Sequence, residues 1–369
     1  MIDESVLKNK SSFREWIESK AKDPAKYITL ERQIFAFFLL EKLIETKVEF
    51  IFKGGTALIL LLEAANRFST DIDILISKPN LEDLEKMFND IASENQMFFK
   101  WDEDIRKGIT FPKKHYRFYY NSEYKSGEQE GYILLDCVFE HNPYLELVKR
   151  EVRNSILPTI EGFDVVSIPS ITDIMIDKLT AFAPNTIGVK FERTSDSGTL
   201  RDHSREVIKQ WFDINELYQK CSDFTYLNQR YQRLATFEIE QRKIEDNYVS
   251  CLKDSLNICL IFLAQGQRNN DIYQKIRKGI RRLDSFVNID LTDSYFITAA
   301  VNVVVLISKV LCADEESYTR TYEKSKEAQP FEDFIKKNNL KKMVSLVKTN
   351  NSSDRDRFVL ALRVIYDLV

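Results

Sequence analysis

Segments with the residue pattern of β-strands are confined to the first part of this chain, and this limits its fold more than any other feature. Before residue 170, β-branched and aromatic runs predict strands at 48–52, 71–76, 115–120, 132–139 and 163–168. From Ser170 onward, apolar residues recur at helical spacing instead. We therefore expect an α+β fold, with a small mixed-sheet domain over residues 1–168 followed by an all-helical domain over residues 169–369.

Helices are expected in both domains, because the chain contains few residues that interrupt them. Its 369 residues include only 10 glycines and 8 prolines, whereas glycine and proline together usually account for about 12% of residues. In the first domain the helical spacing predicts helices at 12–21, 30–46, 56–64 and 81–94. In the second domain it predicts helices at 172–183, 204–218, 226–243, 252–264, 271–287, 294–312, 331–337 and 353–368, with a long loop at 184–200.

Charge and cysteine content exclude several classes of protein. With 53 Lys and Arg against 57 Asp and Glu, the net charge of −4 excludes a global basic field, so a polyanion would have to meet a local patch. The five cysteines form no Cys-x-x-Cys pair, which favours a reducing cytoplasm and disfavours structural zinc. The most apolar run, 295–313, contains Asn302 and Lys309, so we interpret it as a central helix of a soluble bundle and expect no membrane partner.

Two aspartates in the segment 71–76 are candidates for a metal site. Side chains alternate between the two faces of a strand, so Asp71 and Asp73 would leave one face while Ile72 and Ile74 enter the core. Two carboxylates side by side repel each other unless a cation lies between them, and oxygen ligands of this kind suit Mg²⁺. By itself, Asp-x-Asp also fits an exposed acidic strand edge.

The segment before these aspartates favours a phosphate site. Lys53-Gly54-Gly55-Thr56 follows a predicted strand and begins a predicted helix. Glycine lets a phosphate approach the backbone, while the start of a helix supplies N–H donors; Thr56 adds a hydroxyl. The alternatives are a tight strand-to-helix turn and, for Lys53, a surface charge at a strand end.

A third acid, Asp136, interrupts the apolar strand 132–139. A buried, unpaired carboxylate costs several kcal/mol, so Asp136 is a natural third metal ligand. The alternative is an aspartate at a strand end whose carboxylate accepts backbone N–H groups.

Together these motifs resemble those of a known family. Lys53-Gly-Gly-Thr-Ala-Leu58, followed by Arg67-Phe-Ser-Thr-Asp-Ile-Asp73, resembles the first motif of the AbiEii/AbiGii family of nucleotidyltransferase-like toxins, within the DNA polymerase β-like superfamily. Lys178-Leu-Thr-Ala-Phe182 resembles the lysine motif of that family, and Lys209-Gln-Trp-Phe-Asp-Ile214 resembles its Lys-Asp-Leu-Phe-Asp-Leu segment. The resemblance extends over about residues 30–220.

The resemblance implies a two-metal nucleotidyl transfer from a nucleoside triphosphate (NTP). Asp71 and Asp73 would hold two Mg²⁺ ions, and Asp136 would complete the site that holds the attacking hydroxyl. Lys53, Gly54, Gly55 and Thr56 would bind the triphosphate, while Arg67 and Lys178 would neutralise its charge. The alternatives are a structural pairing of Arg67 with the acidic strand and a solvent-exposed Lys178, although the helix that carries Lys178 is otherwise apolar.

The chain departs from the family pattern at one position of the last motif. Gln210 stands where the family often has an acid, which leaves Asp213 as the catalytic acid of this segment, with Asp202 a weaker substitute. The predicted loop 184–200 also lengthens the chain between Lys178 and Asp213.

The nature of the acceptor depends mostly on the resemblance. It implies the toxin of a toxin–antitoxin or phage-defence pair, with a cognate antitoxin and an RNA acceptor, first of all the 3′ end of transfer RNA. Local basic clusters at Lys275–Arg282 and Lys336–Lys342 would suit phosphates, although such runs are usually solvent-exposed helix faces. Two other functions remain open: a small-molecule nucleotidyltransferase of the antibiotic-modifying kind, and a non-catalytic nucleotide-binding regulator.

Overall fold

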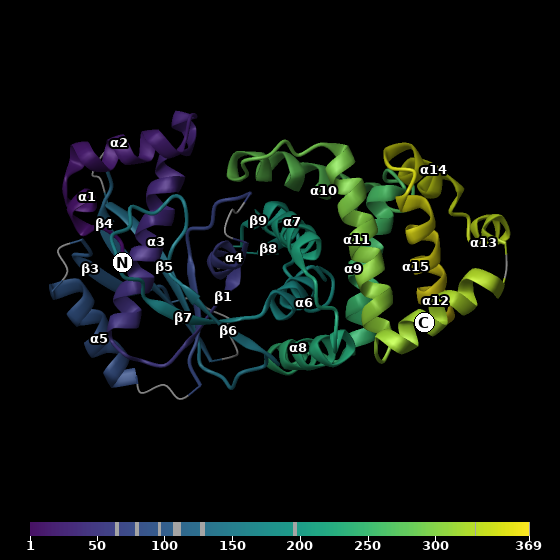
Figure 1. The fold of residues 1–369 in the computed structure, drawn as a ribbon, viewed down its shortest axis with the longest axis horizontal. Helices are drawn as coiled ribbons and strands as arrows, with labels where there is room; N and C mark the ends of the chain where they lie inside the picture. Colours follow the sequence, from purple (N-terminus) through teal and green to yellow (C-terminus); the bar gives the residue numbers. More distant parts are fainter. Residues whose placement is uncertain are drawn as a thin grey trace. The chain divides into compact units, whose positions relative to one another are not determined.

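The chain divides into two compact units, each described here by itself. The computed structural model describes residues 1–62, 66–77, 81–94, 97–105, 112–125, 130–194, 198–328 and 330–368. Unit 1 comprises residues 1–170 together with 285–288, and unit 2 comprises residues 171–284 and 289–369 (Figure 1). The short segment 285–288 therefore belongs to unit 1, although it follows more than a hundred residues of unit 2.

A five-stranded mixed sheet forms the centre of unit 1, as the sequence predicted. Its order is β1-β2-β5-β4-β3, with β2 and β5 parallel and the other pairs antiparallel. The strands are β1 (Ile51–Lys53), β2 (Ile72–Leu75), β3 (Lys100–Glu103), β4 (Lys113–Asn121) and β5 (Glu130–Val138). The sequence analysis did not identify β3, since only one of its four residues is a strong strand former.

Two helices of unit 1 pack their aromatic residues against one face of this sheet. The aromatic ring of Phe35 on α3 (Tyr27–Glu45) stacks on Tyr120 with 3.9 Å between ring centroids, and the ring centroid of Phe88 on α5 (Leu81–Glu94) lies 4.7 Å from that of Tyr116. These rings bury the apolar face, so polar side chains of β2, β4 and β5 lie on the other. The helices of unit 1 are α1 (Glu4–Lys8), α2 (Lys10–Lys20), α3 (Tyr27–Glu45), α4 (Gly54–Leu62) and α5 (Leu81–Glu94), with a 3-10 turn at Pro24–Lys26.

A separate two-stranded sheet completes unit 1. Its strands are β6 (Leu147–Glu151) and β7 (Val165–Pro169), paired antiparallel. The analysis predicted the second strand and missed the first, because β6 is mostly exposed and lacks an alternating apolar face.

Unit 2 is helical apart from one hairpin. The predicted loop 184–200 contains β8 (Glu192–Thr194), which pairs with β9 (Leu200–Asp202). Two amphipathic helices, α12 and α14, were not predicted. The helices are α6 (Ile171–Ala181), α7 (Ser204–Lys220), α8 (Leu227–Arg242), α9 (Tyr248–Leu263), α10 (Asn270–Leu283), α11 (Asp293–Leu311), α12 (Glu315–Ala328), α13 (Phe331–Lys337), α14 (Lys341–Asn350) and α15 (Asp354–Leu368).

The apolar run near residue 300 forms the central helix of unit 2. α11 packs against α7, α9 and α15, and most of its side chains are buried. Among the described residues it is the one helix long and apolar enough to cross a membrane, and 72% of its most apolar window is buried inside the protein. Its hydropathy is therefore explained by burial in a helical core.

Candidate active site

The two glycines after β1 bring side chains against the start of α4. Gly54 has a φ of +77°, and a Cβ atom there would lie 2.1 Å from Oδ2 of Asp73. A Cβ atom on Gly55 would lie 2.6 Å from Nη2 of Arg67. Both glycines belong to the first turn of α4, which begins at Gly54 rather than at Thr56 as predicted. Glycine is thus required here by the close approach of one carboxylate and one guanidinium group, as well as by backbone conformation.

Thr56 connects this turn to the acidic strand. It is fully buried, and its hydroxyl donates to the backbone carbonyl of Asp71 at 2.5 Å and lies 3.0 Å from the hydroxyl oxygen of Ser69. The backbone N–H of Ser69 in turn donates to the side-chain carbonyl oxygen of Gln33 at 3.2 Å. The Thr56 side chain therefore fixes the segment that precedes β2, which leaves its backbone N–H as the group suited to a phosphate.

Four polar residues form a row across the sheet. Lys53 is paired in register with Asp73, Asp73 with Asp136, and Asp136 with His115. Residues in register on neighbouring strands point to the same face, where their Cβ atoms are roughly 5 Å apart. The structure therefore brings together Asp73 and Asp136, which are more than sixty residues apart in the sequence.

The two carboxylates of this row have opposite electrostatic environments. Burial, followed by repulsion from Asp136, raises the pKa of Asp73. Burial also opposes ionisation of Asp136, but a hydrogen bond from Nδ1 of His115 at 2.5 Å and the ammonium of Lys113 at 2.6 Å outweigh it and lower the pKa of Asp136 to about 2. Asp136 is thus held as an anion, and a further cation beside Asp73 would relieve the repulsion.

Sequence reasoning missed His115 and Lys113. Both lie on β4 on the polar face of the sheet, and His115 is only 4% exposed. The alternation of polar and apolar residues in β4 was visible, but the pairing with Asp136 depends on the register between β4 and β5. That register is a property of the tertiary structure.

Asp71 precedes β2, and its charge adds to the effects that raise the pKa of Asp73. The Asp71 side chain is 44% exposed just before β2, where its carboxylate accepts the hydroxyl of Thr70 at 3.4 Å and lies 3.9 Å from the guanidinium of Arg32. Within the part of the chain that the structure describes, no three His, Cys, Asp or Glu side chains converge as a metal site. Asp73 and Asp136 nevertheless fit a hard divalent cation, since two adjacent carboxylates provide the oxygen donors that such an ion prefers.

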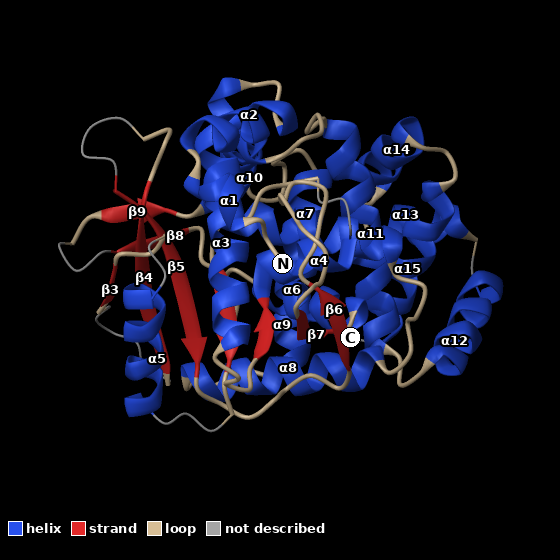
Figure 2. Ribbon diagram, turned by 60° about the vertical axis from the view of Figure 1, so that its left-hand side comes forward, coloured by secondary structure: helices blue, strands red, loops and turns tan. Residues whose placement is uncertain are grey.

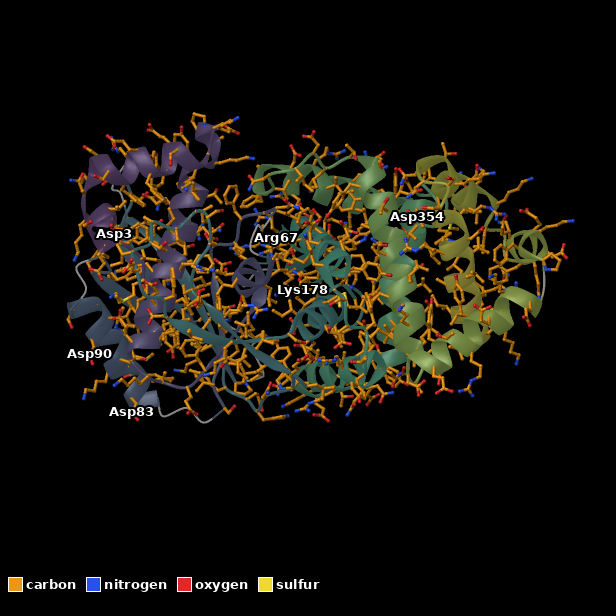
Figure 3. The ribbon with its side chains drawn as sticks, viewed as in Figure 1. Asp3, Arg67, Asp83, Asp90, Lys178 and Asp354 are labelled. Carbon is orange, nitrogen blue, oxygen red and sulfur yellow. The ribbon has the colours of Figure 1, made fainter. Side chains whose placement is uncertain are left out.

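The two predicted phosphate-binding cations of unit 1 differ in exposure. Arg67 is 2% exposed, pairs as a β-bridge with Val287 and donates from Nη1 to the carbonyl of Phe68 at 2.9 Å (Figure 3). Lys53 is half-buried, and its ammonium lies 5.8 Å from the ring centroid of Tyr144. The packing of Arg67 favours a structural contribution to the turn, while Lys53 remains beside Asp73 in register.

The remaining two predicted site residues lie together in unit 2. Nζ of Lys178 on α6 is 3.7 Å from Oδ2 of Asp213 on α7, and both side chains are almost fully buried (Figure 3). The buried position of Lys178 agrees with the apolar character of its helix. Gln210, one turn earlier on α7, donates to the carbonyl of Glu206 at 3.2 Å.

Asp202 has a structural function in unit 2. Its carboxylate accepts the backbone N–H of Ser204 at 3.0 Å and pairs with Lys278, at 3.1 Å, and with Arg282. These contacts outweigh its desolvation and lower its pKa. Asp202 therefore stabilises the first turn of α7 from the end of β9 and links the hairpin to α10, which disfavours it as a substitute for Asp213.

Several cations of the basic helix α10 are paired with acids of unit 2. Lys275 lies 2.6 Å from Glu192 on β8, Lys278 and Arg282 pair with Asp202, and Arg277 pairs with Asp293. Such pairing reduces the positive potential that a phosphate backbone would meet. In the second basic cluster, Lys336, Lys337, Lys341 and Lys342 are exposed.

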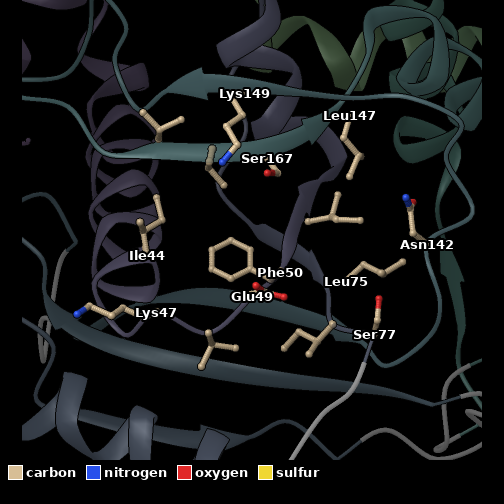
Figure 4. A pocket seen from close by; sticks show the side chains of 15 residues that line it. Ile44, Lys47, Glu49, Phe50, Leu75, Ser77, Asn142, Leu147, Lys149 and Ser167 are labelled. Carbon is tan, nitrogen blue, oxygen red and sulfur yellow. The ribbon is translucent and has the colours of Figure 1, made fainter.

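A pocket of about 690 Å³ in unit 1 lies away from these residues. It is lined by Phe50 and Leu75 and by Leu147 and Ser167 of the β6–β7 sheet (Figure 4). None of the predicted site residues lines it. The candidate chemistry of unit 1 is therefore on the sheet face and the α4 turn rather than in this cavity.

Comparison with known proteins agrees with the motifs in this arrangement. Residues 39–287 match the family model described as nucleotidyl transferase AbiEii toxin, type IV toxin–antitoxin system. The chain belongs to this family. The match includes every residue of the candidate site, among them Lys178 and Asp213 of unit 2. AbiEii membership supports a nucleotidyltransferase with a nucleotide substrate and a cognate antitoxin.

Solved structures with some likeness to this AbiEii protein were also found. JHP933 from Helicobacter pylori is 16% identical with a TM-score of 0.44, covering 80% of this chain and 99% of that one. A putative nucleotidyltransferase from H. pylori is 16% identical with a TM-score of 0.41, covering 75% and 96%. No curated protein matches the sequence.

Proposed function

We propose that this AbiEii protein is a Mg²⁺-dependent toxin that acts in the cytoplasm and transfers a nucleoside monophosphate from an NTP to an RNA, first of all to the 3′ end of transfer RNA. The main support is the register that sets Asp73 beside Asp136 on the polar face of the sheet, with Asp73 against Gly54 at the start of α4. Adjacent carboxylates suit a metal and backbone N–H groups at the start of a helix suit a phosphate, so their proximity supports the proposal.

In such a transfer, different residues of unit 1 would bind the metal, bind the triphosphate and orient the metal ligands. Asp73 and Asp136, with Asp71 completing the set, would hold divalent cations, which when bound neutralise phosphate charge and lower the pKa of the acceptor hydroxyl. The backbone of Gly54, Gly55 and Thr56 would bind the triphosphate. His115 and Lys113 keep Asp136 ionised and oriented. The acceptor oxygen would bond to the α-phosphorus as the hydroxyl loses its proton, and pyrophosphate would leave.

For the other cations we propose supporting functions. Lys53 would counter phosphate charge next to Asp73, and Arg67 would hold the α4 turn through its contact with Gly55. In unit 2, Lys178 would neutralise phosphate charge, with Asp213 holding its ammonium. Replacing Lys178 by methionine, which keeps much of the apolar contact, is expected to lower transfer while unit 2 stays folded.

Labelled nucleotides provide the test. Purified protein is incubated with total bacterial RNA, Mg²⁺ and each of the four α-labelled NTPs in turn, beside Asp73→Asn and Asp136→Asn variants. Label in a transfer-RNA-sized band with one NTP, absent from both variants, would support the proposal. Equal labelling by the variants would exclude the carboxylate site, and label in no RNA would exclude an RNA acceptor for the isolated protein.

Metal binding is measured separately, so that the metal site can be tested even if no RNA is labelled. Mn²⁺ titration followed by electron paramagnetic resonance reports bound metal without any acceptor. The wild type is expected to bind, and Asp73→Asn to lose at least about tenfold in affinity.

A further inference from the structure

Three polar residues lie side by side on the sheet face that carries Asp73 and Asp136. Lys100 on β3 is in register with Tyr119 on β4, and Tyr119 is in register with Tyr132 on β5. Register places all three on one face, and alternation along β5 places Tyr132 on the same face as Asp136. Figure 2 shows β3, β4 and β5 next to one another.

Tyr132 is exposed and Tyr119 is half-buried, whereas the aromatic residues on the opposite face of these strands are buried. The Tyr132 side chain is 40% exposed and Lys100 is exposed, whereas Tyr116, Phe118 and Tyr120 are buried beneath α3 and α5. Packing of the core therefore does not account for two tyrosines on the open face. An aromatic pair that reaches the surface beside a polar site is typical of a binding surface.

Cations lie against both rings. The Tyr119 and Tyr132 centroids are 6.0 Å apart, Nζ of Lys100 is 4.8 Å from the Tyr119 centroid, and Cζ of Arg32 is 5.6 Å from the Tyr132 centroid. The ring of Tyr119 is also anchored, since its hydroxyl donates to Asp102 at 2.8 Å. Asp102 accepts Nε of Arg117 at 2.8 Å as well, so its own charge is compensated.

We propose that this surface, formed by Arg32, Lys100, Tyr119 and Tyr132, binds the single-stranded end of the RNA acceptor. Unpaired bases stack on exposed aromatic rings, and ammonium and guanidinium groups beside the rings bind the phosphates between the bases. A duplex offers no free base face, so it is a poor match for tyrosines on a sheet. The charge of the surface and the chemistry of its rings thus match one ligand, a flexible polyanion with aromatic bases.

The surface is continuous with the candidate active site. Tyr132 precedes Asp136 by four residues on one strand, which corresponds to about 13 Å at the rise of a β-strand. That length is spanned by a few nucleotides of single strand, since one strand of a stacked helix rises about 3.4 Å per nucleotide. A base stacked on Tyr132 would therefore lie a few nucleotides before a terminal hydroxyl at Asp136. This step depends on the proposed function, because it takes Asp136 as the place where the acceptor reacts.

Binding of a short RNA tests the surface without catalysis. The affinity of the full-length protein for a fluorescein-labelled single-stranded RNA of six nucleotides is measured by fluorescence anisotropy, without NTP. Tyr132→Ala is expected to weaken binding by about 5- to 100-fold, the range for loss of one stacked base. Tyr132→Phe keeps the ring and should stay within about twofold of the wild type. Lys100→Gln should weaken binding and reduce its dependence on salt.

A matched control distinguishes an effect specific to this surface from the effect of removing any exposed tyrosine. Tyr366, at the C-terminal end of α15 in unit 2, is 44% exposed, and Tyr366→Ala is expected to bind as the wild type does. Melting temperatures confirm that each variant is folded. Wild-type affinity in Tyr132→Ala, equal loss in Tyr366→Ala, or no binding of the RNA by the wild type would each overturn the inference.

Transfer kinetics distinguish failure of the surface from failure of the proposed function. If RNA is labelled, Tyr132→Ala should raise KM for RNA by a similar factor and leave KM for the NTP unchanged. An unchanged KM for RNA would overturn the surface while the transferase proposal stands. If no RNA is labelled, but the short RNA binds with the expected Tyr132 dependence, the surface stands and the transferase proposal fails. A raised KM for the NTP alone would assign the tyrosines to the donor nucleotide and overturn the inference.

Discussion

The position of Asp73 suits binding of a cation but does not favour the stability of the folded protein without one. Its ionised form is disfavoured by burial and by Asp136, and the pKa of Asp73 is raised as a result. Asp136 on the next strand is stabilised as an anion by His115 and Lys113. A site that destabilises one carboxylate while holding its neighbour charged is a common feature of functional sites.

Replacing Asp73 by asparagine should therefore separate activity from stability. Asp73→Asn is expected to lower nucleotidyl transfer by more than about 100-fold, since a ligand of the divalent cation is lost. Its free energy of unfolding should be at least as large as that of the wild type, because a repelling buried charge is removed. Urea denaturation measures the stability; a clear loss would indicate a structural function for this carboxylate.

Glu41 makes stability depend on pH. Burial raises the pKa of Glu41 to about 7, although the backbone N–H of Ile2 donates to its carboxylate at 2.9 Å. The pKa of an unfolded glutamate is near 4.5. The protonated form is thus favoured in the folded state, and its contribution to stability is complete below pH 4.5 and lost as the pH rises to about 7.

Glu41→Gln should remove this loss. The free energy of unfolding of the variant minus that of the wild type is expected to increase by roughly 3 kcal/mol between pH 4.5 and pH 8, since one pKa unit corresponds to about 1.4 kcal/mol. Urea denaturation at several pH values measures it. Glu45→Gln, one turn later at a 46% exposed side chain, is the control and should follow the wild type.

At the scale of elements, the β1–α4 turn is the connection that determines the site. A strand ends at Lys53, and a helix begins at Gly54 without an intervening loop. The buried hydroxyl of Thr56 then fixes the start of β2 through Asp71. One short turn therefore sets the position of the acidic strand relative to the backbone N–H groups of α4.

Gly54→Ala should lower the free energy of unfolding by more than the positive φ at this position alone would predict. Its φ of +77° disfavours alanine by about 1–2 kcal/mol, and the new Cβ would overlap the Asp73 carboxylate. Gly162→Ala is the matched control in the same unit, with a φ of +85° and no atom within 4 Å of its Cβ. We expect Gly54→Ala to cost at least about 1 kcal/mol more in urea denaturation and to abolish transfer. Equal costs would show that the close approach of Asp73 is unimportant.

At the scale of the whole molecule, the first unit is not a continuous stretch of chain. The N–H of Phe68 donates to the carbonyl of Phe286 at 2.9 Å, and the N–H of Asn288 donates to Asn66 at 2.7 Å. Lys26 also donates to the carbonyl of Val287 at 2.9 Å. Residues 285–288 thus complete unit 1 beside Arg67.

A fragment ending at Ser170 would lack residues 285–288, and with them the hydrogen bond that protects the N–H of Phe68 from exchange. We expect the amide of Phe68 to exchange rapidly in the fragment, while peptides from β4 and β5 keep the protection they have in the full chain. Hydrogen exchange with mass spectrometry measures both regions, and β4 serves as the internal control. Unchanged protection at Phe68 would contradict the assignment of 285–288 to unit 1.

Much of this organisation is present in the sequence itself. Alternation and helical spacing are local properties, so they predicted a mixed sheet before residue 170 and helices after it. The local string from Lys53 to Asp73 was sufficient to indicate the AbiEii family, since its glycines and aspartates lie within about twenty residues of one another. Short or exposed elements such as β3, β6, α12 and α14 escaped because their apolar pattern is weak.

Only the tertiary structure determined which side chains meet. Strand register places His115 next to Asp136 and Tyr132 next to Tyr119, and register depends on packing of the whole sheet. Within unit 2, cations of α10 that the sequence predicted as a phosphate-binding patch form ion pairs with acidic side chains. The sequence determines which chemical groups are available along each element, whereas the partners of those groups depend on contacts between residues far apart in the chain.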